Sequence, residues 1–129
     1  SLPVRVSFVI DRLSRAGTET QLLALLRGLD RTRVRSSLVL LDGTDAESRS
    51  LEPAGCPVVR LGVTRLGSRA AFAAARRLAR EWAAGRPDVV QAYFLDSCYF
   101  AAAVARWCRV PRVVRVRNNL GYWLTARHR

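Results

Sequence analysis

The sequence predicts an α/β fold in which a doubly wound parallel sheet of about five or six strands carries helices on both faces. Three observations lead to this prediction. Short apolar runs rich in β-branched residues recur along the chain, as in strands buried on both faces. Helical segments rich in leucine or alanine separate these runs, which is the alternation of βαβ units. The 129 residues suffice for one core and show no linker or internal repeat, so we expect a single domain over residues 1–129.

The first two strands and the helix between them are expected at the start of the chain. Val4–Ile10 is a mostly apolar run that predicts a buried strand, and a short loop over residues 12–17 follows it. Thr18 and Gln21 form a capping-box pattern, which places a helix N-terminus at Thr18. The apolar face of that helix consists of Leu22, Leu23, Leu25, Leu26 and Leu29. Residues 34–41 predict the second strand.

A loop, a short strand and an amphipathic helix are expected in the middle of the chain. Residues 42–48 predict a polar loop, residues 50–55 a short helical turn and residues 57–61 a third strand. Residues 69–84 form the clearest amphipathic pattern, and Gly85 and Pro87 end it. We expect its buried face to consist of Phe72, Ala75, Leu78, Ala79 and Trp82.

The C-terminal part repeats the alternation. Residues 88–93 predict the fourth strand, and Asp96 or Ser97 can cap the alanine-rich helix that follows. Residues 111–116 predict the fifth strand. Beyond it we expect a loop over residues 117–121 and the start of another helix over residues 122–129.

The charge of the chain points to anionic partners. All 22 basic residues are arginine, against 10 acidic residues, which gives a net charge of +12. Such an excess suits the phosphates of a nucleotide sugar, a lipid phosphate, an acidic membrane surface or nucleic acid. The arginines are scattered and no nucleic-acid-binding motif is present, so we expect no specific nucleic-acid partner.

Several kinds of site and segment are excluded by the same inventory. Three cysteines at unrelated spacings and a single histidine cannot supply a zinc site, so we expect reduced cysteines and no metal. No run is long and apolar enough to span a membrane, and no secretory signal opens the chain. We therefore expect a cytoplasmic protein. The sequence has no dinucleotide fingerprint and no P-loop, and it implies no cofactor.

Candidate binding residues follow the first, fourth and fifth predicted strands, where open α/β sheets bind their ligands. The segment with Ala16, Gly17 and Thr18 precedes a helix N-terminus, which suits a phosphate, and Gly17 allows close backbone approach. Gln91 and Tyr93 carry groups suited to sugar hydroxyls. The third candidate segment follows the fifth strand and contains Arg117, Asn118 and Asn119. Asp11 and Asp96 are the only acidic side chains at such positions, and the catalytic residues are unknown.

Five short motifs, in order, resemble the N-terminal domain of the family-4 retaining glycosyltransferases. They are Ala16-Gly17-Thr18-Glu19-Thr20-Gln21-Leu22-Leu23, Leu51 with Gly55 and Pro57-Val58, Arg86-Pro87-Asp88-Val89-Val90-Gln91-Ala92-Tyr93, Pro111-Arg112-Val113-Val114, and the polar loop Arg117-Asn118-Asn119. Enzymes of this family consist of two facing Rossmann-like domains, the GT-B fold. The resemblance implies that this chain is the acceptor-side half and that the C-terminal donor-binding domain is absent.

The resemblance also implies an activity. The whole enzyme would transfer a hexose from a nucleotide-diphosphate sugar to a carbohydrate or lipid-phosphate acceptor with retention and without a metal, as in bacterial cell-surface polysaccharide biosynthesis. Ala16, Gly17 and Thr18 would approach the donor phosphates, and Gln91, Tyr93 and residues 117–119 would face the sugar or acceptor. The isolated domain would be inactive and would contact the inner face of the cell membrane peripherally. Ala16 replaces a family glycine, and Gln91 and Tyr93 replace frequent histidines.

Two alternatives come from other functional classes. The first is a stand-alone flavodoxin-like binding or regulatory domain without catalysis. Its response-regulator form is disfavoured because Asp11 is not part of an acidic pair and the chain has no lysine. The second is a nucleic-acid-binding module, which the scattered arginines support only as weak, salt-sensitive binding.

Overall fold

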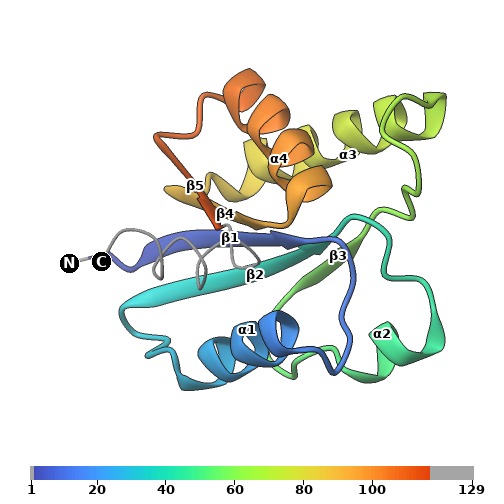
Figure 1. Cartoon of the computed structure of the whole chain (residues 1–129). Coiled ribbons are helices and arrows are strands. Elements are labelled where there is room, and N and C mark those ends of the chain that lie inside the picture. The colour runs from blue at the N-terminus through green and yellow to red at the C-terminus, as the bar shows by residue number, and fades with distance from the viewer. Residues whose placement is uncertain (1, 117–129) are drawn as a thin grey trace, which may run out of the picture.

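The fold is a five-stranded parallel sheet between two layers of helices (Figure 1). The structure is a computed structural model and describes residues 2–116. Its strands are β1 (Val4–Ile10), β2 (Val34–Leu40), β3 (Val58–Arg60), β4 (Val89–Tyr93) and β5 (Arg112–Val116). Its helices are α1 (Gly17–Gly28), α2 (Ala46–Ser50), α3 (Arg69–Gly85) and α4 (Leu95–Cys108). The predicted α/β class is confirmed.

The order of the strands, β3-β2-β1-β4-β5, places β1 in the centre of the sheet. From β1 the chain winds outward to β2 and β3, then returns to the other side of β1 for β4 and β5. The direction of winding therefore changes between β1 and β4. In open α/β sheets this switch point, at the carboxyl ends of the strands, is where ligands bind.

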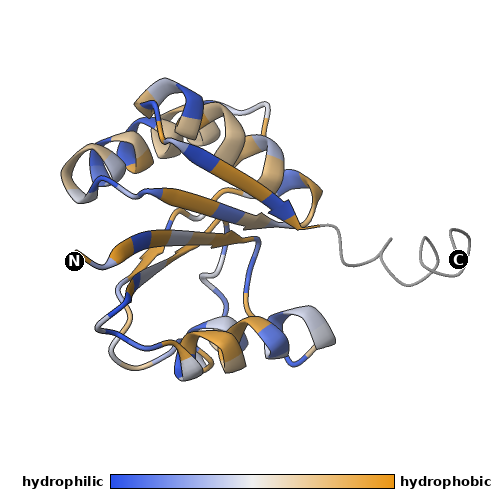
Figure 2. Ribbon diagram, turned by 90° about the vertical axis from the view of Figure 1, so that its left-hand side faces the viewer, coloured by the Kyte–Doolittle hydropathy of each residue, from blue (hydrophilic) through white to orange (hydrophobic). Residues whose placement is uncertain are grey.

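Side chains of β1 alternate between the two faces of the sheet. Phe8 and Ile10 pack on the leucines of α1, whereas Val9 packs against α3 and α4. Figure 1 shows α1 and α2 below the sheet and α3 and α4 above it, and Figure 2 shows the mostly hydrophobic strands between these layers. Each fully buried aliphatic side chain in these two cores contributes about 1.5–3 kcal/mol to stability.

One buried polar group on the α3 side of the sheet is satisfied by a tryptophan. Ser7 is 1% exposed, and its Oγ accepts a hydrogen bond of 3.0 Å from the Trp82 indole Nε1. The hydroxyl that interrupts the apolar run of β1 therefore fastens α3 to the central strand, which keeps the burial of both groups inexpensive.

The start of α1 differs from the prediction. The N-cap is Ala16, not Thr18, and no side chain caps the helix directly. Instead, the Ser14 hydroxyl accepts from the Ala16 N–H at 3.3 Å and donates to Glu19 Oε2 at 2.9 Å. A serine outside the helix thus links the N-cap to the third helical residue, a connection that the capping-box pattern at Thr18 did not reveal.

Two further local predictions were wrong. The short helix lies at Ala46–Ser50 rather than at residues 50–55, because the Asp45 side chain caps it by accepting from the Ser48 N–H. In α3 the buried face contains Ala71 and Ala74 rather than Phe72, which is 65% exposed. At 3.6 residues per turn, both alanines project within about 40° of Leu78, whereas Phe72 projects about 120° away.

Candidate functional site

The candidate site is the carboxyl edge of the sheet at the switch point, where β1 and β4 both end. The loop over residues 11–16 leads from β1 into α1, and Phe94 alone connects β4 to α4. Two helix N-termini therefore open at the same edge of the sheet. The first-turn N–H groups of a helix have no intrahelical acceptor, so such an edge attracts anions and other hydrogen-bond acceptors.

Asp11, directly after β1, joins the two sides of the switch point. Its carboxylate accepts hydrogen bonds from the hydroxyl and from the backbone N–H of Ser97, in the first turn of α4. Burial raises the pKa of Asp11, the hydrogen bonds from Ser97 oppose that rise, and the charges of Asp96 and Glu19 add to it. Asp11 thus supplies the cap of α4 from a strand far away in sequence. The expected cap residue Ser97 is the donor in this contact rather than the acceptor.

Phe94 adopts a backbone conformation that is normally found only at glycine. Its φ of 70° and ψ of 161° lie in a region that residues with a side chain rarely adopt, at a cost of about 1–3 kcal/mol. As the N-cap of α4 it offers no side-chain hydrogen bond, which explains why Asp11 is needed there. The strained peptide turns the chain from β4 into α4 within one residue, directly beside the candidate site.

Glu19 brings a second carboxylate to this edge. It is 7% exposed, and one carboxylate oxygen, Oε2, accepts from the Ser14 hydroxyl. The other, Oε1, is buried without a hydrogen-bond partner among the described residues. A buried acceptor without a donor is unfavourable, so Glu19 is a group that a hydroxyl or water donor would satisfy.

An ion pair network fixes the loop after β1 against the loop after β2. Arg12 makes a two-pronged contact with Asp45, at 2.6 Å and 3.1 Å, and reaches Glu47 at 3.0 Å. The guanidinium lowers the pKa of Asp45 to about 2, and both carboxylates raise the pKa of Arg12. The Leu13 N–H donates to the fully buried Ser48 Oγ at 2.9 Å, which ties the same loop to α2.

A pocket of about 200 Å³ opens beside Asp11. Asp11, Asp42, Asp96 and Arg12 line it, together with Thr64 and apolar side chains. Ionised carboxylates only accept hydrogen bonds, so this lining suits a ligand rich in hydroxyl donors. Among residues 2–116 no group of three His, Cys, Asp or Glu side chains could hold a metal ion.

The structure places some of the predicted site residues at this edge. Ala16, Gly17 and Thr18 lie at the start of α1, and Ala16 and Gly17 are exposed. No atom outside its neighbours lies within 4 Å of a Cβ built on Gly17, whose φ is not positive. A side chain would therefore fit at Gly17 within the fold itself, and only a ligand in contact with the backbone would require a glycine there.

Gln91 and Tyr93 lie on β4 and contact each other. The Gln91 Nε2 donates to the Tyr93 hydroxyl at 2.7 Å, and Tyr93 is 6% exposed in the core beside α1. Burial raises the pKa of the Tyr93 phenol. Arg117, Asn118 and Asn119 lie outside the described residues. The sugar-contacting role of these five residues stays a prediction.

Sequence reasoning missed the roles of Ser97, Glu19 and Phe94. Asp11 was noted as a polar residue after a buried strand, but its partner lies 86 residues away. The glutamate three residues after Ala16 occupies the position of a capping-box acid, and this spacing was the available signal for Glu19. Nothing in the residue type of Phe94 indicates its positive φ.

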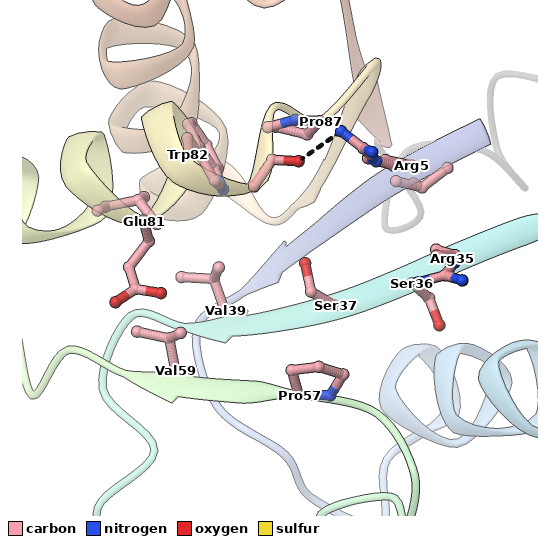
Figure 3. Close-up of a pocket in the computed structure, with 13 residues that line it drawn as sticks. Arg5, Arg35, Ser36, Ser37, Val39, Pro57, Val59, Glu81, Trp82 and Pro87 are labelled. Atoms are coloured by element: carbon pink, nitrogen blue, oxygen red, sulfur yellow. Dashed lines mark hydrogen bonds between the residues drawn. The ribbon is translucent and has the colours of Figure 1, made fainter. Parts of the chain in front are cut away.

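A larger pocket lies at the opposite, amino-terminal edge of the strands (Figure 3). Its volume is about 320 Å³, and Figure 3 shows Glu81 and Trp82 of α3 above Val39 and Val59 of the sheet. Arg5 borders it and donates to the Gly85 carbonyl at 3.3 Å. Because ligands of doubly wound sheets bind at the carboxyl edge, we do not place the candidate site in this pocket.

Comparison with known proteins identifies the domain type. Residues 16–129 match the family described as "Glycosyl transferase 4-like domain". Comparisons with curated proteins and with solved structures give no significant match. No helix within residues 2–116 is both long and apolar enough to cross a membrane. The matched region begins at the N-cap of α1 and includes β2 to β5, so the chain belongs to the glycosyl transferase 4-like domain family and is a glycosyltransferase domain with a Rossmann-like α/β fold.

Proposed function

We propose that this chain is the acceptor-side, N-terminal half of a two-domain GT-B glycosyltransferase. The family match over residues 16–129 carries the proposal. The complete enzyme transfers a sugar from a nucleotide-diphosphate sugar to an acceptor hydroxyl with retention of configuration and without a metal. This half forms one wall of the cleft, and a second domain holds the nucleotide.

The carboxyl edge of the sheet supports the assignment of acceptor binding to this half and of nucleotide binding to a second domain. The start of α1 offers N–H groups and the positive end of a helix dipole, which suit the donor phosphates when the two domains close. The carboxylates around Asp11 suit hydroxyl donors of a sugar. The two hydroxyl–carboxylate pairs at this edge, Ser97 with Asp11 and Ser14 with Glu19, hold the starts of α4 and α1, so we assign this half to binding and orientation rather than to bond cleavage.

The acceptor is a carbohydrate or a lipid phosphate. The net charge of +12 favours an anionic group on it. Arg117, which follows the last residue of β5, is our candidate for contacting that anion, and Gln91 and Tyr93 are candidates for contacting hydroxyls.

A ligand-observed NMR screen of the 129-residue domain tests the proposal. The compounds screened are nucleotide sugars, free nucleotides, free sugars and a short-chain polyprenyl phosphate. We expect binding of the sugar or lipid phosphate, weakened at least fivefold in Arg117→Ala, and little response to free nucleotides. Arg112→Ala, at the other end of β5, is the matched control and should bind as the wild type does.

Two outcomes would count against the proposal. Tight nucleotide binding by this domain alone would place the donor site in the wrong half. A domain that ignores every sugar and lipid phosphate would favour the flavodoxin-like binding or regulatory module instead.

A further inference from the structure

The outer surface of α3 and α4 combines exposed aromatic side chains with arginines. Phe72 on α3 is 65% exposed, and Tyr99 and Trp107 on α4 are 61% and 59% exposed. The same two helices carry five exposed arginines, of which Arg76, Arg80 and Arg106 accompany these aromatic side chains. We call this surface the α3–α4 face and define it by Phe72, Arg76, Arg80, Tyr99, Arg106 and Trp107. Figure 1 shows both helices in the same layer, on the side of the sheet away from α1.

Helical spacing places the residues of this face together and away from the core. Phe72, Arg76 and Arg80 recur every four residues and form one stripe of α3. The buried stripe of the same helix, which contains Leu78 and Trp82, lies on its other side. The aromatic side chains of the α3–α4 face are therefore not part of the core of the described domain.

A groove of about 360 Å³ between the two helices connects the stripe of α3 to α4. Arg76 and Arg80 line it from α3, and Trp107 and Cys108 line it from α4, with alanines at its base. No acidic side chain lines it. None of Arg76, Arg80 and Arg106 has a hydrogen bond or ion pair to another residue of the described part of the chain, so their charge is not neutralised there.

The two acidic residues of α3 and α4 lie elsewhere. Glu81 lines the pocket between α3 and the amino ends of the strands, and Asp96 lines the pocket at the carboxyl edge. The α3–α4 face is therefore uniformly basic between its aromatic side chains. Such a face attracts anions and repels none of them locally.

We propose that the α3–α4 face binds the surface of an anionic lipid bilayer. Tryptophan and tyrosine rings favour the headgroup region, where one end of the ring is apolar and the other is wet. Arginines near an anionic leaflet contribute about a fivefold gain in affinity each, so the three arginines together supply about a 100-fold gain. Arginine and aromatic side chains are enriched in protein–protein interfaces as well, so the charge of the groove decides. Arg76 and Arg80 line it beside Trp107 without an acidic side chain, and an anionic leaflet supplies negative charge over the whole face.

The apolar side chains of this face make nucleic acid a poorer partner than a bilayer. Phe72 and Leu95, which is 66% exposed, offer apolar surface that phosphate and groove edges do not match.

The N-termini of α3 and α4 point toward the carboxyl edge of the sheet, because each helix follows a strand of the parallel sheet. A domain bound through this face therefore holds its candidate site close to the bilayer. This inference goes beyond the proposed function, because lipid binding requires no sugar transfer.

Vesicle flotation of the 129-residue protein tests the proposal. Vesicles of phosphatidylcholine alone are compared with vesicles that also contain phosphatidylglycerol, at low and at high salt. We expect binding only to the phosphatidylglycerol vesicles, weakened by salt. The double variant Arg76→Gln/Arg80→Gln should bind about 25-fold more weakly. The matched control Arg33→Gln/Arg49→Gln removes the same charge from the turn before β2 and from α2, outside the α3–α4 face, and should bind as the wild type does.

Tryptophan fluorescence gives a second, position-specific readout. Entry of Trp107 into the headgroup region should shift its emission to the blue, and Trp107→Phe should abolish the shift although Trp82 and Trp123 remain. Circular dichroism checks that each variant is folded. The proposal is overturned if the control variant weakens vesicle binding as much as the double variant does, or if the protein binds no vesicles. If it binds DNA through these arginines and binds no vesicles, the face is assigned to nucleic acid instead. If sugars fail to bind while vesicles bind, only the proposed function is refuted.

Discussion

Ser97→Ala tests whether Asp11 caps α4 across the switch point. The Ser97 side chain is fully buried, so water cannot replace its hydroxyl, and its partner is a partly buried carboxylate. A hydrogen bond to a charged group contributes about 1.5–3 kcal/mol, so we expect a loss of about 2 kcal/mol in the free energy of unfolding at pH 7. Because the bond to a protonated, neutral carboxyl contributes only about 1 kcal/mol, the loss should shrink toward low pH.

The sign of this pH dependence follows from the pKa of Asp11. Burial raises that pKa in the folded state, so the carboxyl's ionisation destabilises the fold as pH rises through the folded pKa. Removing the hydroxyl raises the folded pKa further, so the variant loses additional stability over the same pH range.

Urea unfolding, followed by circular dichroism between pH 4 and pH 8, measures the effect. Ser48→Ala is the matched control, because Ser48 is equally buried but its Oγ accepts from a backbone N–H, which does not titrate. Its cost should be independent of pH. If the Ser97→Ala cost is the same at both ends of the range, Asp11 is not a charged cap and the argument fails.

Three further predictions concern strain, acid stability and the contact between α3 and β1. Phe94→Gly should be more stable than Phe94→Ala by about 1–2 kcal/mol, since only glycine relieves the positive φ; the reverse order in thermal unfolding would contradict the strain. The lowered pKa of Asp45 makes its stabilising effect complete above its unfolded pKa of 3.8 and lost as pH falls toward 2; Arg12→Ala should return that pKa toward 3.8 in a carboxyl NMR titration, and an unchanged pKa would refute the ion pair. Trp82→Phe should cost about 2 kcal/mol by leaving the Ser7 hydroxyl without its partner, and this cost should be smaller in a Ser7→Ala background, as a double-mutant cycle would show.

The strands and the layered fold could be predicted because their signals are local. The limits of β1 were predicted to the residue, since an apolar run of seven residues ends at the polar Asp11. The parallel pairing followed from alternation with helices, because a crossover helix returns the chain to the same edge of the sheet. The order of the strands could not be predicted, since it depends on which buried faces match in three dimensions.

The details of the candidate site could not be predicted because they depend on contacts between distant segments. The helix caps show the difference. Asp45 lies three residues from the N–H that it caps, whereas Asp11 caps α4 from 86 residues away. For α3, Phe72 was predicted in the core because its stripe of the helix adjoins the stripe of Leu78 and Trp82. Which stripe is buried depends on the packing of Ala71 and Ala74 against the sheet, and the sequence pattern does not show that packing.

The central position of β1 affects how the chain folds during synthesis. Its partner on one side, β2, follows after a single helix, but Arg5 and its contact Asp88 on the β4 side are 83 residues apart. A nascent chain can therefore close the β1–β2 half early, while the other edge of β1 stays unpaired until β4 has left the ribosome. During that interval the exposed hydrogen-bonding groups of β1 are open to the strands of other chains. Chains that end before β4 should therefore aggregate rather than form a smaller stable domain.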